Sequence, residues 1–326
     1  MTDYKNVRYK YPTVTLSGAT ESSPASGDIW YDSGKFYFGT SLTLLGAWSS
    51  GGNLATAKYS VGGFGTQTAA VCAGGTAVNN VPLNVTEEYN GTAWSSGGNL
   101  ATARMGLAGA GTLSAGLSFA GHTGSNNVVN TTEEYDGSSW SAGGNLGTAR
   151  LSPAGAGTQS AAICMGGYTN TTTDITEEYD GTSWSAGGDL SQNMYISAGA
   201  GTLLAGLNFG GSGTLALTEE YNGTSWSAGG DLNTARYSHG GTGTQSAGLC
   251  MGGSPVGALD STEEYDGTSW SAAGDLATQR YAMGAAGTTS AGLCFGGYTP
   301  SFSNVTEEYG AGAGSYDELF YTSQGL

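Results

Sequence analysis

The sequence predicts an all-β fold made of six repeated, four-stranded antiparallel units. The segment Thr-Glu-Glu-Tyr recurs six times at intervals of about 44 residues, and a repeat of this period indicates an array of small structural units. Glycine supplies 59 of the 326 residues, while 10% aromatic residues argue against a disordered chain. No stretch carries a sustained apolar period of 3.6 residues, so helices are not expected.

The fifth repeat illustrates the four strands, which are expected at residues 237–243, 247–251, 262–265 and 269–271. Asp266-Gly267 separates the last two strands. An Asp-Gly pair between strand-forming residues is a strong hairpin signal, and it predicts a type I′ turn with positive φ at both central residues. The last two strands of each repeat are therefore expected to be antiparallel neighbours.

Two further columns of residues recur with fixed spacing. Five repeats reach a Trp after Thr-Glu-Glu-Tyr, and a sixth Trp precedes the first repeat; this column is Trp48, Trp94, Trp140, Trp184, Trp226 and Trp270. Ten residues after each Trp lies a basic residue, except that Met194 replaces it once; the basic column is Lys58, Arg104, Arg150, Arg236 and Arg280. Both columns are expected to be structural.

A repeat that combines Gly-Gly after a strand, Glu-Tyr-Asp, Trp and Arg resembles the kelch repeat. The resemblance covers residues 48–309 and implies a β-propeller, in which four-stranded blades surround an axis, as in the central domain of galactose oxidase. The repeated segment Trp-Ser-Ala-Gly-Gly-Asp-Leu also resembles repeats in tail-fibre-type virion proteins of marine bacteriophages.

The ends of the repeat array are out of phase, which predicts how the ring closes. Trp48 comes before any complete repeat, while the last Thr-Glu-Glu-Tyr, at 306–309, has no Trp after it. We expect the strand around Trp48 to complete the last blade and remove an exposed sheet edge, giving six blades. The alternative is a seventh blade made from residues 29–38 and 315–322. The expected domains are an arm and hairpin at 1–40, the propeller at 41–309 and a tail at 310–326.

Six pairs of adjacent glutamates could serve acid-base chemistry, but neighbouring residues on a strand point to opposite faces. One Glu of each pair is instead expected to contact the basic column. The four cysteines occur one per repeat and are expected to be free, buried thiols: Cys72, Cys164, Cys250 and Cys294. His122 and His239 lie three repeats apart, so they predict no shared metal site, and no copper site like that of galactose oxidase is expected. The sequence thus predicts no enzyme and no cofactor.

One connection in each repeat, between its second and third strands, varies in length, whereas the rest of the repeat is constant. Because strands alternate in direction, these connections should lie on one face. Polar and aromatic residues in them are candidate ligand contacts: Asn79, Asn80, Asn126, Asn127, Tyr168, Asn170 and Tyr298.

The formal net charge of −17 argues against nucleic acid and anionic lipid as partners, and no apolar segment predicts a secretory signal or membrane insertion. We expect a non-enzymatic structural or recognition protein of a phage particle, made in the host cytoplasm and part of an oligomeric assembly. Residues 1–40 would attach it to other virion subunits, and its loops would contact host glycans or proteins. The alternatives are a cellular kelch-like interaction module and a carbohydrate-active enzyme.

Overall fold

The computed structural model describes residues 29–32, 35–38, 46–78, 80–124 and 127–310. The chain divides into two compact units, one of residues 1–44 with 312–326 and one of residues 45–311. In the first unit, β1 (Ile29–Asp32) pairs with β2 (Lys35–Phe38) in an antiparallel hairpin. Residues 1–28 of the expected arm and 311–326 of the expected tail lie outside the described residues, whereas Gly310, expected to begin the tail, is the last residue of a propeller strand. No helix capable of crossing a membrane is found in the described ranges.

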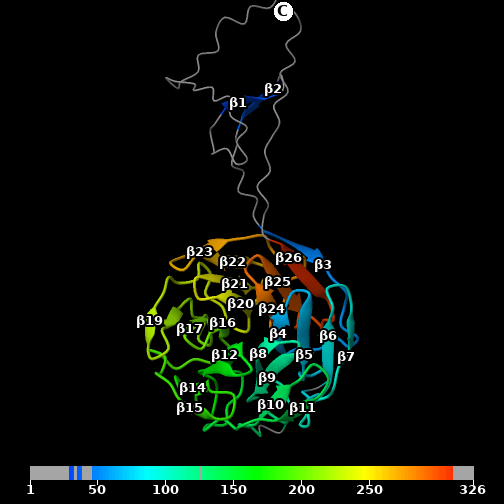
Figure 1. Ribbon diagram of the computed structural model, residues 1–326, viewed down its shortest axis with the longest axis vertical. Coiled ribbons are helices and arrows are strands. Elements are labelled where there is room, and N and C mark those ends of the chain that lie inside the picture. The colour runs from blue at the N-terminus through cyan, green and yellow to red at the C-terminus, as the bar shows by residue number, and fades with distance from the viewer. Residues whose placement is uncertain (1–28, 33–34, 39–45, 79, 125–126, 311–326) are drawn as a thin grey trace, which may run out of the picture. The chain divides into compact units, whose positions relative to one another are not determined.

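The second unit is a ring of six four-stranded antiparallel sheets, which confirms the predicted six-bladed propeller (Figure 1). Figure 1 shows the first strand of each blade near the centre of the ring and the fourth at its rim. Numbered along the chain, the blades comprise: blade 1, β4 (Gly62–Thr66), β5 (Ala69–Ala73), β6 (Thr86–Tyr89), β7 (Trp94–Ser96); blade 2, β8 (Ala108–Thr112), β9 (Ala115–Phe119), β10 (Thr132–Tyr135), β11 (Trp140–Ala142); blade 3, β12 (Ala154–Thr158), β13 (Ala161–Met165), β14 (Thr176–Tyr179), β15 (Trp184–Ala186); blade 4, β16 (Ala198–Thr202), β17 (Ala205–Phe209), β18 (Thr218–Tyr221), β19 (Trp226–Ala228); blade 5, β20 (Gly240–Thr244), β21 (Ala247–Met251), β22 (Thr262–Tyr265), β23 (Trp270–Ala272); and blade 6, β24 (Gly284–Thr288), β25 (Ala291–Phe295), β26 (Thr306–Gly310), β3 (Ala47–Ser50).

The ring is closed by a strand that comes before the first repeat in the sequence. Strand β3 pairs antiparallel with β26, with Trp48 opposite Tyr309, so the strand that precedes blade 1 completes blade 6. On the inner side, a Cβ on Gly63 would lie only 2.7 Å from the Ala285 carbonyl oxygen, which is why β4 and β24 need glycine to approach. The seven-blade alternative is wrong: β1 and β2 pair only with each other among the described strands.

Two local expectations were also wrong. The first strand of blade 5 begins at Gly240 instead of residue 237, because Ser238 has a φ of 52° that interrupts the extended backbone. The Asp266-Gly267 turn is not type I′, since Gly267 has a φ of 89° and Asp266 is not among the residues with positive φ. The hairpin instead holds four residues between Tyr265 and Trp270, and the Asp266 carboxylate accepts backbone N–H bonds from Thr268 and Ser269.

Identical contacts fasten each blade to the preceding one. The indole Nε1 of Trp140 in blade 2 donates to Thr86 Oγ1 of blade 1 at 2.9 Å, and the Tyr135 hydroxyl of blade 2 donates to Glu88 Oε1 of blade 1. Both contacts recur at all six blade junctions, with the second Glu of each pair as the acceptor. The outer strands thus hold the ring together through polar links as well as apolar packing.

The first Glu of each pair lies inside its own blade and meets the basic column. The five cation-to-carboxylate distances range from 2.5 to 2.9 Å, and all five basic side chains are fully buried. In blade 3, Arg150 also donates from Nη1 to the backbone carbonyls of Gly166 and Ile175. The pairs are Lys58–Glu87, Arg104–Glu133, Arg150–Glu177, Arg236–Glu263 and Arg280–Glu307.

Candidate functional site

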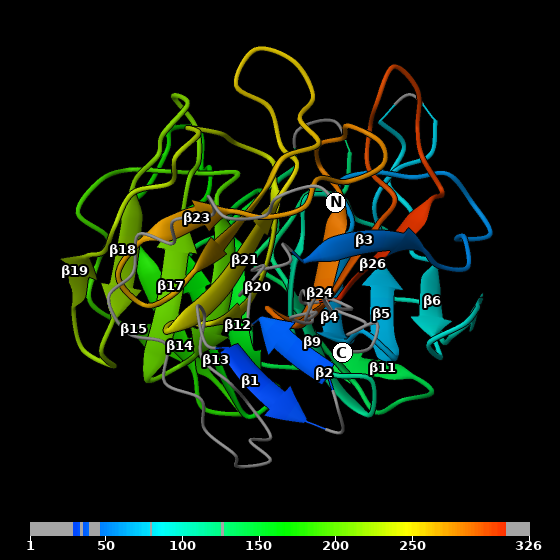
Figure 2. The same ribbon diagram turned by 90° about the horizontal axis from the view of Figure 1, so that it is seen from above.

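The variable connections and the links between blades share one face of the ring, which we call the loop face; Figure 2 shows these long connections gathered on one side. Each link is tied to the variable connection of the blade that it enters. Tyr59, for example, bridges to Thr76, and Tyr281 bridges to Tyr298. The face is therefore a set of backbone-bonded loops on a ring of sheets, an arrangement suited to presenting side chains to a ligand.

At the centre of the loop face, six backbone hydrogen bonds form a closed circle around the axis. One residue of each blade donates its N–H to the carbonyl of the equivalent residue in the preceding blade, at 2.7 to 3.0 Å. All six residues have φ between 49° and 62°, which is the left-handed region of backbone conformation. Only one of the six is a glycine, the residue type that adopts this conformation routinely. The six are Ser60, Gly106, Ser152, Ile196, Ser238 and Ala282. This axial circle fixes how far the blades stand apart.

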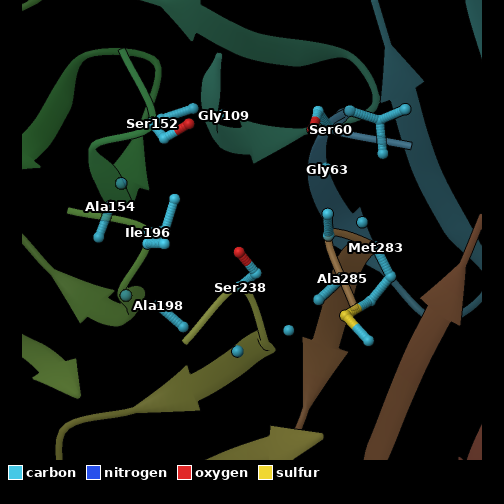
Figure 3. Close-up of a pocket in the computed structure, with 18 of the residues that line it drawn as sticks. Ser60, Gly63, Gly109, Ser152, Ala154, Ile196, Ala198, Ser238, Met283 and Ala285 are labelled. Carbon is cyan, nitrogen blue, oxygen red and sulfur yellow. The ribbon is translucent and has the colours of Figure 1, made fainter. Parts of the chain in front are cut away.

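The axial circle borders a cavity of about 160 Å³, seen in Figure 3, where the Ser152 and Ser238 hydroxyls are directed toward the opening. Its lining is made of small apolar residues and a few hydroxyls. His239 is the one ionisable side chain among the lining residues, and burial together with the charge of Arg236 lowers its pKa to about 3. At neutral pH this imidazole is therefore uncharged, and the cavity lining carries no ionised side chain.

An aromatic cluster lies off the axis on the loop face, at the junction of blades 6 and 1. Tyr59 stacks on Phe302 with ring centroids 5.2 Å apart and planes 14° apart, and Tyr298 contacts both rings edge-on. Tyr281 packs on Tyr298 at 5.3 Å. All four side chains, Tyr59, Tyr281, Tyr298 and Phe302, are half-buried, so each offers a ring surface to solvent. We call these four residues the aromatic cluster.

Polar and apolar groups of blade 1 extend the aromatic cluster. The Tyr59 hydroxyl donates to Asn80 Oδ1 at 2.6 Å, and Val78 and Val81 are 59% and 57% exposed. Burial and the neighbouring Tyr298 raise the pKa of the Tyr59 hydroxyl, which keeps it a neutral donor. Nearby connections, at residues 76–85, 122–131 and 298–305, contain no Asp, Glu, Lys or Arg. This sector is uncharged in a protein of net charge −17.

The structure brings together only some of the residues predicted as ligand contacts. Tyr298 belongs to the aromatic cluster and Asn80 adjoins it. Tyr168 lies in blade 3, where its ring packs on Tyr195. Asn170 lies in the same connection of blade 3 and has a φ of 129°. Asn127 donates to Thr123 within its own loop. Asn79 and Asn126 lie outside the described residues.

Sequence reasoning missed Tyr59 and Tyr281, which lie on links between blades, not in the variable connections. The available signal was a column of large side chains one residue after the basic column: Tyr59, Met105, Leu151, Tyr195, Tyr237 and Tyr281. Because the links share a face with the variable connections, this column also reaches the ligand surface.

The structure assigns the ionisable groups mainly to the scaffold. The glutamate pairs are divided between ion pairs inside blades and tyrosine links between blades. The four cysteines are buried and free. Among the described residues, no group of three or more His, Cys, Asp or Glu side chains is placed to hold a metal ion.

Comparison with solved structures supports the architecture. A structure titled "Structure of YjhT" superposes with a TM-score of 0.66 at 12% sequence identity and covers 80% of this chain and 96% of its own. This likeness shows the propeller fold. Because 374 solved chains match, the fold does not select one function. No protein-family model matches the chain, and no curated protein matches it. The propeller architecture is compatible with a protein-interaction module.

Proposed function

We propose that this protein is a non-enzymatic recognition protein whose aromatic cluster binds a neutral glycan. The observation that carries the proposal is the meeting of Tyr59, Tyr281, Tyr298 and Phe302 on the loop face, beside Asn80. Tyrosine gives a large, rigid contact surface at low entropic cost, and its hydroxyl adds a polar contact. Rings of this kind can pack against the C–H faces of a sugar.

The surrounding chemistry favours a neutral ligand. Amide and hydroxyl groups can donate to and accept from sugar hydroxyls, whereas the nearby connections offer no charged side chain to pair with an ionic ligand. A polar site with a few rings and hydrogen-bonding groups is typical of small-ligand recognition. A carbohydrate-active enzyme would in addition need two carboxyl groups flanking one bond, and the cluster has none.

Glycan-array binding tests the proposal with two matched variants. Tyr298→Ala removes a ring of the aromatic cluster, while Tyr168→Ala removes a ring from the same face in blade 3. We expect the wild type and Tyr168→Ala to bind the same neutral glycans and Tyr298→Ala to lose that binding. Equal binding by both variants would place the ligand elsewhere, and no glycan binding at all would favour a protein-interaction module.

We propose a phage particle as the setting, with residues 1–40 joining other virion subunits. This part of the proposal rests on the resemblance of the repeats, such as Trp-Ser-Ala-Gly-Gly-Asp-Leu, to those of tail-fibre-type proteins. Mass spectrometry of purified particles tests it: the chain should be present in stoichiometric amounts. Its recovery from cells without any particle would favour a cellular interaction module.

A further inference from the structure

Blade 4 breaks the rule that a cation meets the first Glu of each pair. Met194 takes the position of the basic residue, and Glu219 is nevertheless 2% exposed. Its Oε1 accepts the Ser191 N–H at 3.0 Å, as the equivalent carboxylates accept a backbone N–H in the other blades. Its Oε2 has no hydrogen-bond partner among the described residues. In four other blades the equivalent oxygen accepts a hydrogen bond from an Arg Nη2, and in blade 1 it lies 2.9 Å from Lys58 Nζ without a hydrogen bond. Among the six blades, blade 4 is therefore the one that buries this carboxylate oxygen without a neighbouring cation.

A second acceptor oxygen without a partner lies next to it. Asn208 is opposite Glu219 in the β17–β18 register, so the two side chains share a face of the sheet. Asn208 is 1% exposed, and its Nδ2 donates to Ser197 Oγ at 3.2 Å, yet its Oδ1 has no partner among the described residues. Four of the other blades have Cys at this position and one has Ser. The unpartnered amide oxygen occurs only in the blade that lacks the cation.

The other blades indicate which further oxygens surround this position. Arg150 Nη1 donates to the carbonyls of Gly166 and Ile175 at 2.9 and 2.6 Å, and Arg236 repeats the pattern in blade 5. The equivalent carbonyls in blade 4 belong to Gly210 and Leu217. A carboxylate, an amide and backbone carbonyls form a set of hard oxygen ligands, which suits alkali and alkaline-earth cations better than soft metals.

We propose that blade 4 binds a monovalent alkali cation, Na⁺ or K⁺, in the place that a guanidinium or ammonium group takes in the other blades. The cation contacts Glu219 Oε2 and Asn208 Oδ1. One positive charge balances the single carboxylate, whereas a divalent ion would leave a buried excess of charge, which is unfavourable. This inference goes beyond glycan recognition and is independent of it, because the site lies inside the ring wall.

Thermal unfolding of the full chain in NaCl, KCl and tetramethylammonium chloride at equal ionic strength tests the proposal. Bound cation stabilises the folded state by mass action, so we expect a Tm about 2 °C or more higher in at least one alkali salt. Met194→Arg supplies a tethered cation, and this variant should have a higher Tm that no longer depends on the salt. Equal wild-type Tm values in all three salts would overturn the proposal.

Two further results distinguish a bound cation from a bound proton. Glu219→Gln removes the charge but keeps an oxygen for the Ser191 N–H, and its Tm should not depend on the cation. Should this variant not fold, Met194→Arg still decides, because a salt dependence equal to that of the wild type would contradict the site. A Tm that does not depend on the cation but falls with rising pH would indicate that a proton occupies this position. That result would also overturn the proposal.

Discussion

Trp48 and Tyr309, from opposite ends of the repeat array, are partners on adjacent strands, and their rings pack at a centroid distance of 5.0 Å. The same Tyr–Trp contact occurs inside each of the other five blades, between residues close in sequence. In blade 6, therefore, the same contact joins segments from the two ends of the repeat array. This pairing is what closes the ring of six blades.

Arg150→Ala should lower stability by about 3 to 5 kcal/mol, because it leaves the Glu177 carboxylate buried without its cation. Arg150→Lys is the matched control, since Lys58 makes the equivalent pair in blade 1 and should retain part of the stability. Thermal unfolding measures both variants. If Arg150→Ala and the wild type have the same Tm, the buried pairs do not stabilise the ring.

Tyr135→Phe should destabilise the junction of blades 1 and 2 by about 1.5 to 3 kcal/mol, because the Glu88 carboxylate loses a hydrogen-bond donor. Urea unfolding measures the change in midpoint. Tyr195→Phe serves as the control, since the Tyr195 hydroxyl makes no hydrogen bond with the described residues and its loss should be nearly neutral. Equal midpoints for the two variants would contradict the role of the tyrosine links.

The tyrosine links also predict alkaline unfolding. Burial and the bond to a carboxylate raise the pKa of Tyr89, Tyr135, Tyr179, Tyr221 and Tyr265 to about 12, and raise that of Tyr309 as well. The protonated hydroxyl is thus favoured in the folded state. Its contribution is complete below the ordinary tyrosine pKa of about 10 and is lost as pH rises toward 12. Tyrosinate absorbance and circular dichroism should change together in that range; titration near pH 10 with the fold intact would contradict this.

Ser152→Val should destabilise the axial circle by about 1 to 3 kcal/mol, because a β-branched residue is strained at a φ of 49°. Ser152→Gly is the control, since Gly106 holds the equivalent position with a φ of 62°, and it should be neutral or slightly stabilising. Thermal unfolding compares them. If valine is tolerated as well as glycine, the left-handed backbone at this position is not a constraint.

Sequence reasoning predicted features that depend on repeats and on charge balance. The five basic residues between Trp48 and Tyr309 recur in register with the glutamate pairs, so contact between the two columns could be inferred without coordinates. The partner of the second Glu was missed. Its signal was present in Thr-Glu-Glu-Tyr itself, but the tyrosine hydroxyl reaches the neighbouring blade, and no single repeat contains that contact.

The backbone conformation of the axial circle could not be predicted from the sequence. Serine, isoleucine and alanine occupy left-handed positions in the axial circle, and nothing in residues such as Ile196 marks them for positive φ. The closed circle of hydrogen bonds imposes that conformation, and it also ends the strand that was expected to start at residue 237. Similarly, the aromatic cluster could not be assembled beforehand, because Tyr59 and Tyr298 become neighbours only when the ring closes.

Closure of the ring can be measured directly by disulfide formation between β3 and β26. Ala47 lies opposite Gly310, both are exposed, and a Cβ on Gly310 would meet nothing within 4 Å. Cα atoms of paired antiparallel residues lie at about 4.5 to 5.5 Å, which suits a disulfide. The Ala47→Cys, Gly310→Cys double variant should form this bond within the folded monomer on mild oxidation, as peptide mapping would detect, while the four native cysteines stay buried and reduced. Failure to link these two positions, or linkage only between molecules, would contradict a propeller sealed by its first strand.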